Sequence, residues 1–290
     1  MKLITKGIIL AGGKGTRLSP LTRVANKQLL PIYDKPMIFY PLSILMLAGI
    51  KNILIIVNKG QIKNFFNVLG DGKRLGIKIQ YKIQNKPKGI ADAFILGKSF
   101  IKKDNVCLIL GDNFFYGQSL TNKLLKAKNH SNGATIFLKT VKNPENFGVA
   151  VIKNTKIDYI KEKPKKFISS QAITGLYFFD NDVIKISENL KPSKRNELEI
   201  TDVLKFYQKK GNLKYEEIGR GAIWSDAGKI EDLANLSNFV QSVEKVQNIK
   251  IACLEEISLN QGWISQKQNQ KNIEFYGKCD YGKYLANIKK

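Results

Sequence analysis

A glycine-rich segment follows the first short apolar stretch of the chain. Residues 10–18 are Leu-Ala-Gly-Gly-Lys-Gly-Thr-Arg-Leu, and a strand is predicted just before them. Backbone N–H groups of such a turn can converge on a phosphate. The segment is not a Rossmann fingerprint, because Leu18 stands where Gly or Ala is required, and no Gly-Lys-Ser/Thr closes a Walker A loop. Arg17 and Lys27 add cations, which favours a phosphate site over a plain strand-exit turn.

Two aspartates stand where metal ligands are expected. Asp112 follows the apolar run 106–110, and ligands of open α/β sheets bind outside the carboxyl ends of the strands. Asp226 precedes a glycine turn and a predicted helix. Carboxylates are the groups with which proteins hold Mg²⁺ beside phosphates. Taken alone, Asp112 also fits a turn and Asp226 a helix N-cap, so a metal site requires that the fold bring them together.

A lysine and the scarcity of histidine narrow the chemistry further. Lys163 is predicted to project from the end of a strand that Pro164 closes, although a charged turn also explains this segment. His130, the only histidine, lies in a polar stretch, which argues against Ser-His-Asp, Cys-His and His-metal chemistry. Carboxylates, cations, a hard metal ion and backbone donors remain. Phosphoryl or nucleotidyl transfer suits that set, because its catalysis is mostly positioning and charge neutralisation.

Strands and helices alternate along the first half of the chain. Apolar runs of strand length occupy residues 6–10, 52–57, 77–83 and 106–110. Helical patterns occupy residues 41–48, 61–69 and 90–100. Such alternation indicates βαβ units around a parallel sheet, at whose edge the glycine-rich turn and Asp112 would lie.

The second half has a different pattern. Further strands are predicted at residues 134–140, 148–152, 156–161 and 172–179. Helices are predicted at residues 197–210 and 229–247, and shorter ones follow from residue 249. Because no linker or repeat interrupts the chain, we expect one compact α/β domain with a C-terminal helical extension.

Composition excludes several classes of protein. The 290 residues include 48 Lys and Arg against 24 Asp and Glu, a net charge of +24, which raises the alternative of a nucleic-acid-binding protein. Arginine, the preferred ligand of phosphates and base edges, occurs at only five positions, and the lysines are scattered, so we expect no nucleic acid partner. Three widely spaced cysteines fit neither a disulfide framework nor a metal site. No apolar run is long enough for a membrane span or a signal peptide, so we expect a cytoplasmic protein without a membrane partner.

Several segments together resemble the sugar nucleotidyltransferases, and most closely the short-form glucose-1-phosphate thymidylyltransferases. The first is GIILAGGKGTRLSPLTRVANKQLLPIYDKPMIFYPLSILMLAGI, residues 7–50. The others are LGDNFFYG, EKP, TGLYFFDNDV, LKPS with ELEITDV, GRGAIWSDAG and, in the tail, EEI, GWI and DYGKYL. The resemblance covers essentially the whole chain, and the run KQLLPIYDKPMI is its most specific part.

The resemblance implies an activity and its partners. dTTP and α-D-glucose 1-phosphate would give dTDP-glucose and pyrophosphate with Mg²⁺ as cofactor, the first step of dTDP-rhamnose and related deoxysugar biosynthesis. It also implies a homotetramer, a dimer of dimers. The implied fold is a Rossmann-like, mostly parallel central sheet flanked by helices, in a single nucleotidyltransferase domain. Its nucleotide-binding part would span about residues 1–130, a small sugar-binding β portion about 131–228 and the helical extension about 229–290.

The resemblance also implies roles for individual residues. The catalytic set would be Arg17, Lys27, Asp112, Lys163 and Asp226, of which Asp112 and Asp226 would hold the metal. The nucleotide would be bound by Leu10, Gly12, Gly13, Gly15, Thr16, Gln28, Gln84 and Gly89. The sugar would be bound by Asn113, Gly148, Glu162, Thr174, Gly175 and Tyr177. A second, regulatory nucleotide site would include Gly117, Arg220 and Lys250.

The chain departs from the family pattern near the base and at the second site. Lys86, Lys88 and Asp92 change the base-binding turn, and Asp92 replaces a usual glutamine. Phe147 replaces a usual tyrosine near the sugar, and Gln118 replaces a histidine of the second site. These changes leave open a uridylyl- or cytidylyltransferase that uses the same machinery. A catalytically inactive regulator is a further alternative, against which the retained aspartates and Lys163 argue.

Overall fold

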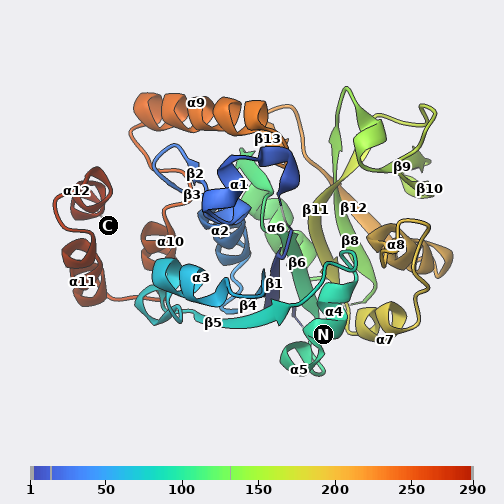
Figure 1. The fold of residues 1–290 in the computed structure, drawn as a ribbon, viewed down its shortest axis with the longest axis horizontal. Helices are drawn as coiled ribbons and strands as arrows, with labels where there is room; N and C mark the ends of the chain where they lie inside the picture. The colour runs from blue at the N-terminus through green and yellow to red at the C-terminus, as the bar shows by residue number, and fades with distance from the viewer. Residues whose placement is uncertain (1–2, 14, 131, 289–290) are drawn as a thin grey trace.

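A nine-stranded sheet organises the chain, with helices packed on both of its faces (Figure 1). The computed structural model describes residues 3–13, 15–130 and 132–288. Strand order along the sheet is β10-β9-β11-β6-β1-β4-β5, with β8 paired to β11 and β12 paired to β8. The α/β class and the central parallel strands expected from the sequence are confirmed.

The part of the sheet built from β1, β4, β5 and β6 is parallel. Its strands are β1 (Lys6–Ala11), β4 (Asn52–Asn58), β5 (Lys78–Gln84) and β6 (Val106–Leu110). β1 lies between β4 and β6 and runs parallel to both. Ile8 and Ile9 are fully buried in the hydrophobic clusters on opposite faces, as the alternation of a strand covered on both sides requires.

Beyond β6 the sheet becomes largely antiparallel. The strands are β8 (Ala134–Thr140), β9 (Gly148–Lys153), β10 (Lys156–Glu162), β11 (Gln171–Phe179) and β12 (Leu213–Glu217). β11 is antiparallel to β6, β8 and β9, whereas β12 is parallel to β8. Two small sheets lie outside it: β7 (Phe114–Gly117) with β13 (Ala222–Ser225), and β2 (Pro31–Ile32) with β3 (Lys35–Pro36).

Two groups of helices cover the sheet. On one face lie α2 (Phe39–Leu47), α3 (Ile62–Leu69) and α6 (Leu120–Lys128), and on the other α4 (Asp92–Leu96), α5 (Lys98–Ile101), α7 (Asp182–Glu188) and α8 (Ile200–Lys209). The short helices are α1 (Leu21–Val24), η1 (Thr16–Leu18), η2 (Lys27–Leu29), η3 (Lys73–Leu75) and η4 (Pro144–Asn146).

Two predicted helices were wrong in detail. The helix expected at residues 90–100 is two short helices, α4 and α5, that meet at Gly97. A Cβ at Gly97 would lie 2.9 Å from the side chain of Ile8, so glycine lets this backbone approach β1. The helix expected to begin at residue 197 begins at Ile200, and the residues before it line the cleft described below.

The C-terminal helices are α9 (Ile230–Gln247), α10 (Leu254–Asn260), α11 (Gln266–Tyr276) and α12 (Asp280–Asn287). α9 packs against the β2–β3 hairpin, whereas α11 and α12 lie at one end of the molecule, away from the main sheet (Figure 1). The fully buried carboxylate of Glu255 in α10 binds Arg74 and accepts hydrogen bonds from Tyr276 (3.0 Å) and Tyr281 (2.6 Å). This Glu255 cluster ties α11 and α12 to the body. Across the described ranges, no helix has the length and apolarity that crossing a membrane demands.

Candidate active site

A cleft of about 320 Å³ opens at the carboxyl ends of β1 and β6. The chain places β4 and β5 on one side of β1 and β6 on the other, so the strand order reverses between β1 and β6. Ligands of open α/β sheets bind at this switch point. The cleft extends from the turn after β1 to residues of β10, β11 and the segment before α8.

The turn after β1 and the segment after β5 form one wall. Leu10, Gly12, Gly13, Arg17, Gln84 and Gly89, all predicted to act on the nucleotide, line the cleft. A Cβ at Gly12 would lie 2.1 Å from Oε1 of Gln84, so only glycine permits this packing. Gly89 has φ +98°, and a Cβ there would lie 2.4 Å from the carbonyl oxygen of Leu198.

Asp112 and Asp226 meet beside this wall, although they are remote in sequence. Nζ of Lys27 lies 2.6 Å from Oδ2 of Asp112 and donates to the carbonyl oxygen of Asp226 at 3.3 Å. Burial, together with the negative charge of Asp112, raises the pKa of Asp226. Asp226 is not a helix N-cap, because Lys229 occupies that position in α9. Lys27 itself is buried and lies behind the cleft, as the counter-charge of Asp112.

A neighbouring glycine brings Arg17 to the same place. A Cβ at Gly228 would lie 3.1 Å from both carboxylate oxygens of Asp226 and 3.2 Å from Nη2 of Arg17. The guanidinium and the carboxylate therefore flank one small residue. Ala227, which joins Asp226 to Gly228 in the chain, has φ +42°, an unusual conformation for a residue with a side chain. We did not predict Gly228, although it belongs to the segment that Asp226 marks.

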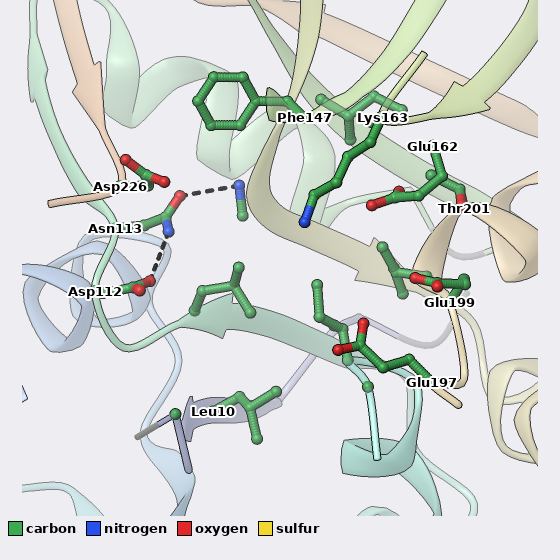
Figure 2. Close-up of a pocket in the computed structure, with 18 of the residues that line it drawn as sticks. Leu10, Asp112, Asn113, Phe147, Glu162, Lys163, Glu197, Glu199, Thr201 and Asp226 are labelled. Atoms are coloured by element: carbon green, nitrogen blue, oxygen red, sulfur yellow. Dashed lines mark hydrogen bonds between the residues drawn. The ribbon is translucent and has the colours of Figure 1, made fainter. Parts of the chain in front are cut away.

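Asn113 joins Asp112 to two other elements. Its Nδ2 donates to Oδ1 of Asp112 at 3.0 Å (Figure 2). Its Oδ1 accepts from the N–H of Gly175 at 3.0 Å and from Nε1 of Trp224 at 2.7 Å. Only 2 % of Asn113 is exposed. The amide that we predicted to bind the sugar thus has three protein partners, and it fixes the orientation of Asp112.

The opposite end of the cleft is lined by the residues predicted to bind sugar and its phosphate. Gly148, Glu162, Gly175 and Tyr177 lie in its wall, and Lys163 reaches into the space between the aspartates and the glutamates (Figure 2). Lys163 has φ +38°, which is a strained backbone conformation. Its backbone N–H donates a hydrogen bond to the carbonyl oxygen of Phe147 at 3.0 Å, which helps to hold this conformation. Burial and the nearby charge of Glu199 raise the pKa of Glu162.

Sequence reasoning missed a charged cluster beside Glu162. Nη2 of Arg195 lies 3.0 Å from Glu162, 3.4 Å from Glu197 and 2.7 Å from Glu199, and all four residues line the cleft. The segment ELEI, quoted for its resemblance, contains both new glutamates. The isolated Arg195 in a chain so poor in arginine was the available signal.

Some predicted residues do not line the cleft. Gly15 packs against Thr22 and Lys27, Thr16 begins η1, and Gln28 and Thr174 are buried behind the wall. These four residues therefore pack around the cleft wall and do not form its surface.

The residues predicted for a second site lie elsewhere. Gly117 of β7 pairs with Ala222 of β13, and the exposed Arg220 precedes Ala222 by two residues. Nζ of Lys250 binds Asp34 and Glu244. The binding of a regulatory nucleotide at these residues stays a prediction.

Comparisons with known proteins show the family to which this chain belongs. The nucleotidyl transferase family model matches residues 6–243. A glucose-1-phosphate thymidylyltransferase of Neisseria meningitidis is 50 % identical over 98 % of this chain and 99 % of its own length. One from Mycobacterium tuberculosis is 43 % identical over 98 % of both chains.

Solved structures show the same fold. A crystal structure from Bacillus anthracis assigned as a glucose-1-phosphate thymidylyltransferase has a TM-score of 0.75 and 42 % identity, covering 81 % of this chain and 94 % of that one. A UDP-glucose pyrophosphorylase complexed with UDP-glucose has a TM-score of 0.72 and 25 % identity, covering 83 % and 99 %. The fold is that of a nucleotidyltransferase. The chain belongs to the nucleotidyl transferase family and, within it, to the glucose-1-phosphate thymidylyltransferases.

Proposed function

We propose that this enzyme transfers dTMP from dTTP to α-D-glucose 1-phosphate, releasing dTDP-glucose and pyrophosphate. One observation supports the proposal above all others. A single cleft is lined by the glycine-rich turn after β1, by Asp112 and Asp226, and at its other end by polar residues, and Arg17 and Lys163 also line it. Relatives that are up to 50 % identical over nearly the whole chain have the name of this activity.

The chemistry requires charge neutralisation rather than a general base. A phosphate monoester has a second pKa near 6, so about neutral pH it is already mostly a dianion. One of its oxygens attacks the α-phosphorus of dTTP, the bond to the pyrophosphate oxygen breaks, and the electron pair leaves with pyrophosphate. The obstacle is repulsion between two anions. Arg17 would face the triphosphate, and Lys163 the sugar phosphate.

The residues at the aspartate pair fit a magnesium ion. Burial and the charge of Asp112 raise the pKa of Asp226, and a cation bound by both carboxylates would favour the ionised form of Asp226. Two carboxylates completed by phosphate and water oxygens are an ordinary ligand set for Mg²⁺. Asp112 and Asp226 would hold Mg²⁺, and the bound ion would offset the charge of the reacting phosphates.

The other expectations stay part of the proposal. We propose a cytoplasmic homotetramer that supplies dTDP-glucose to rhamnose and related deoxysugar synthesis, with neither nucleic acid nor membrane as a partner. A regulatory nucleotide site would include Gly117, Arg220 and Lys250.

Pyrophosphate release from purified protein tests the proposal. With Mg²⁺ and α-D-glucose 1-phosphate, we expect release with dTTP to exceed that with UTP, CTP, ATP or GTP. Asp112→Asn should abolish turnover, whereas Asp182→Asn, an exposed carboxylate on α7, should not. Release that favours UTP would keep the mechanism but change the assigned base, and no release with any nucleotide would contradict the proposal.

A further inference from the structure

The buried carboxylate of Asp92 lies behind Gln84, a residue of the cleft wall formed by the turn after β1 and the segment after β5. Asp92, the first residue of α4, is 7 % exposed, and Gln84, the last residue of β5, is 3 % exposed. Nε2 of Gln84 donates to Oδ2 of Asp92 at 2.9 Å. Asp92 is not among the residues lining the cleft, whereas Gln84 is. Asp92 is therefore placed to act on a ligand in this cleft through Gln84.

This contact fixes which end of the Gln84 amide faces which way. An ionised carboxylate only accepts hydrogen bonds, so it binds the nitrogen of an amide and repels the oxygen. The oxygen then points elsewhere, and the structure has it against Gly12, 2.1 Å from where a Cβ would stand. Gly12 belongs to the cleft wall. Gln84 is thereby held as a hydrogen-bond acceptor on the cleft side.

A fixed acceptor distinguishes bases by their protonation pattern. Thymine and uracil have an N3–H donor, whereas N3 of cytosine is an acceptor. An acceptor facing N3 binds the first two and repels the third, and a site built for one hydrogen-bond pattern rejects the opposite pattern strongly. If the amide could rotate by half a turn, Gln84 would present a donor and this difference would shrink.

We propose that Asp92 is a positioning residue that holds Gln84 as an acceptor and so restricts the site to keto pyrimidine nucleotides. The inference rests on the proposed function, because it names the nucleotide class of the same cleft. This contact selects against cytosine, and it does not by itself distinguish thymine from uracil.

A helix role for Asp92 makes a different prediction. Acidic residues in a first helical turn stabilise the helix dipole, and both Asp92 in α4 and Asp182 in α7 occupy this place. Asp182 is exposed and lies outside the cleft. Asp182→Asn is therefore a matched control that removes the dipole contribution without touching Gln84.

The test compares kcat/KM for dTTP and dCTP, by pyrophosphate release with glucose 1-phosphate. We expect wild type to prefer dTTP by about 100-fold or more, and Asp92→Asn and Asp92→Ala to narrow this ratio about tenfold or more, with KM for glucose 1-phosphate unchanged. Asp182→Asn should keep the wild-type ratio. Thermal unfolding of each variant confirms that folded protein is compared.

Each outcome decides. A wild-type enzyme that uses dCTP as well as dTTP overturns the inference, as does a folded Asp92 variant with an unchanged ratio. Absence of turnover with every nucleotide would instead contradict the proposed function.

Discussion

Removing the ammonium of Lys27 should destabilise the fold through Asp112. Lys27→Met keeps the side chain nearly as long but removes the charge of Nζ, which lies 2.6 Å from Oδ2 of Asp112. The two side chains are 6 % and 26 % exposed. Unit charges about 4 Å apart attract by about 4 kcal/mol at an effective dielectric constant near 20, and breaking a buried pair costs about 3–5 kcal/mol. Because Asp112 is a quarter exposed, we expect a loss of about 2–3 kcal/mol.

Urea unfolding of a double-mutant cycle measures the coupling directly. Lys27→Met, Asp112→Asn and the double variant should give a coupling of about 2 kcal/mol. Lys98 and Glu188 provide the control, because their ion pair is as short (2.7 Å) but 61 % and 36 % exposed. Lys98→Met with Glu188→Gln should couple by less than about 1 kcal/mol. A Lys27–Asp112 coupling no larger than that of the surface pair would refute the reasoning.

Three further predictions concern other parts of the molecule. Because burial and Glu199 raise the pKa of Glu162, its charge is present above that pKa and is lost as the pH falls through it. KM for glucose 1-phosphate should therefore rise more on mild acidification in the wild type than in Glu162→Gln, in which only the substrate phosphate titrates, and an equal rise in both would contradict this. Gly89→Ala places a Cβ 2.4 Å from a backbone oxygen at φ +98°, so KM for dTTP should rise about tenfold, whereas Gly60→Ala, at φ +82° with nothing within 4 Å, should leave KM as it is. Glu255→Gln should lower the free energy of unfolding by about 3 kcal/mol, measured by chemical unfolding, and leave turnover per folded molecule unchanged. A loss below about 1 kcal/mol would contradict the conclusion that Glu255 ties α11 and α12 to the body.

The parallel half of the fold was predictable from the sequence, whereas several pairings were not. Runs such as residues 52–57 and 106–110 are apolar throughout because both faces of these strands are covered. The β7–β13 pairing joins residues about a hundred positions apart, and neither short strand has a pattern that distinguishes it from a loop. Local composition therefore could not reveal it.

The active site also combines features that the sequence predicts with features that only the fold shows. Asp112 and Arg17 follow strands that are visible in the sequence, so their common edge could be predicted. The approach of Asp226 to Asp112 depends on β13 pairing with β7, which only the fold provides. Arg195 was missed because its significance lies in three carboxylates that gather around it from β10 and from the extended segment before α8.

The Glu255 cluster also has a consequence for local unfolding. α11 and α12 contact mainly each other and α10, and their own hydrophobic cluster consists of Cys253, Tyr281 and Leu285 with a few partly buried neighbours. Elements with few buried contacts can open as one cooperative unit while the rest stays folded. We expect their amides to exchange with solvent together and faster than those of β1 and β6. The C-terminal end of this enzyme would then have its own free energy of opening, set mainly by one buried carboxylate.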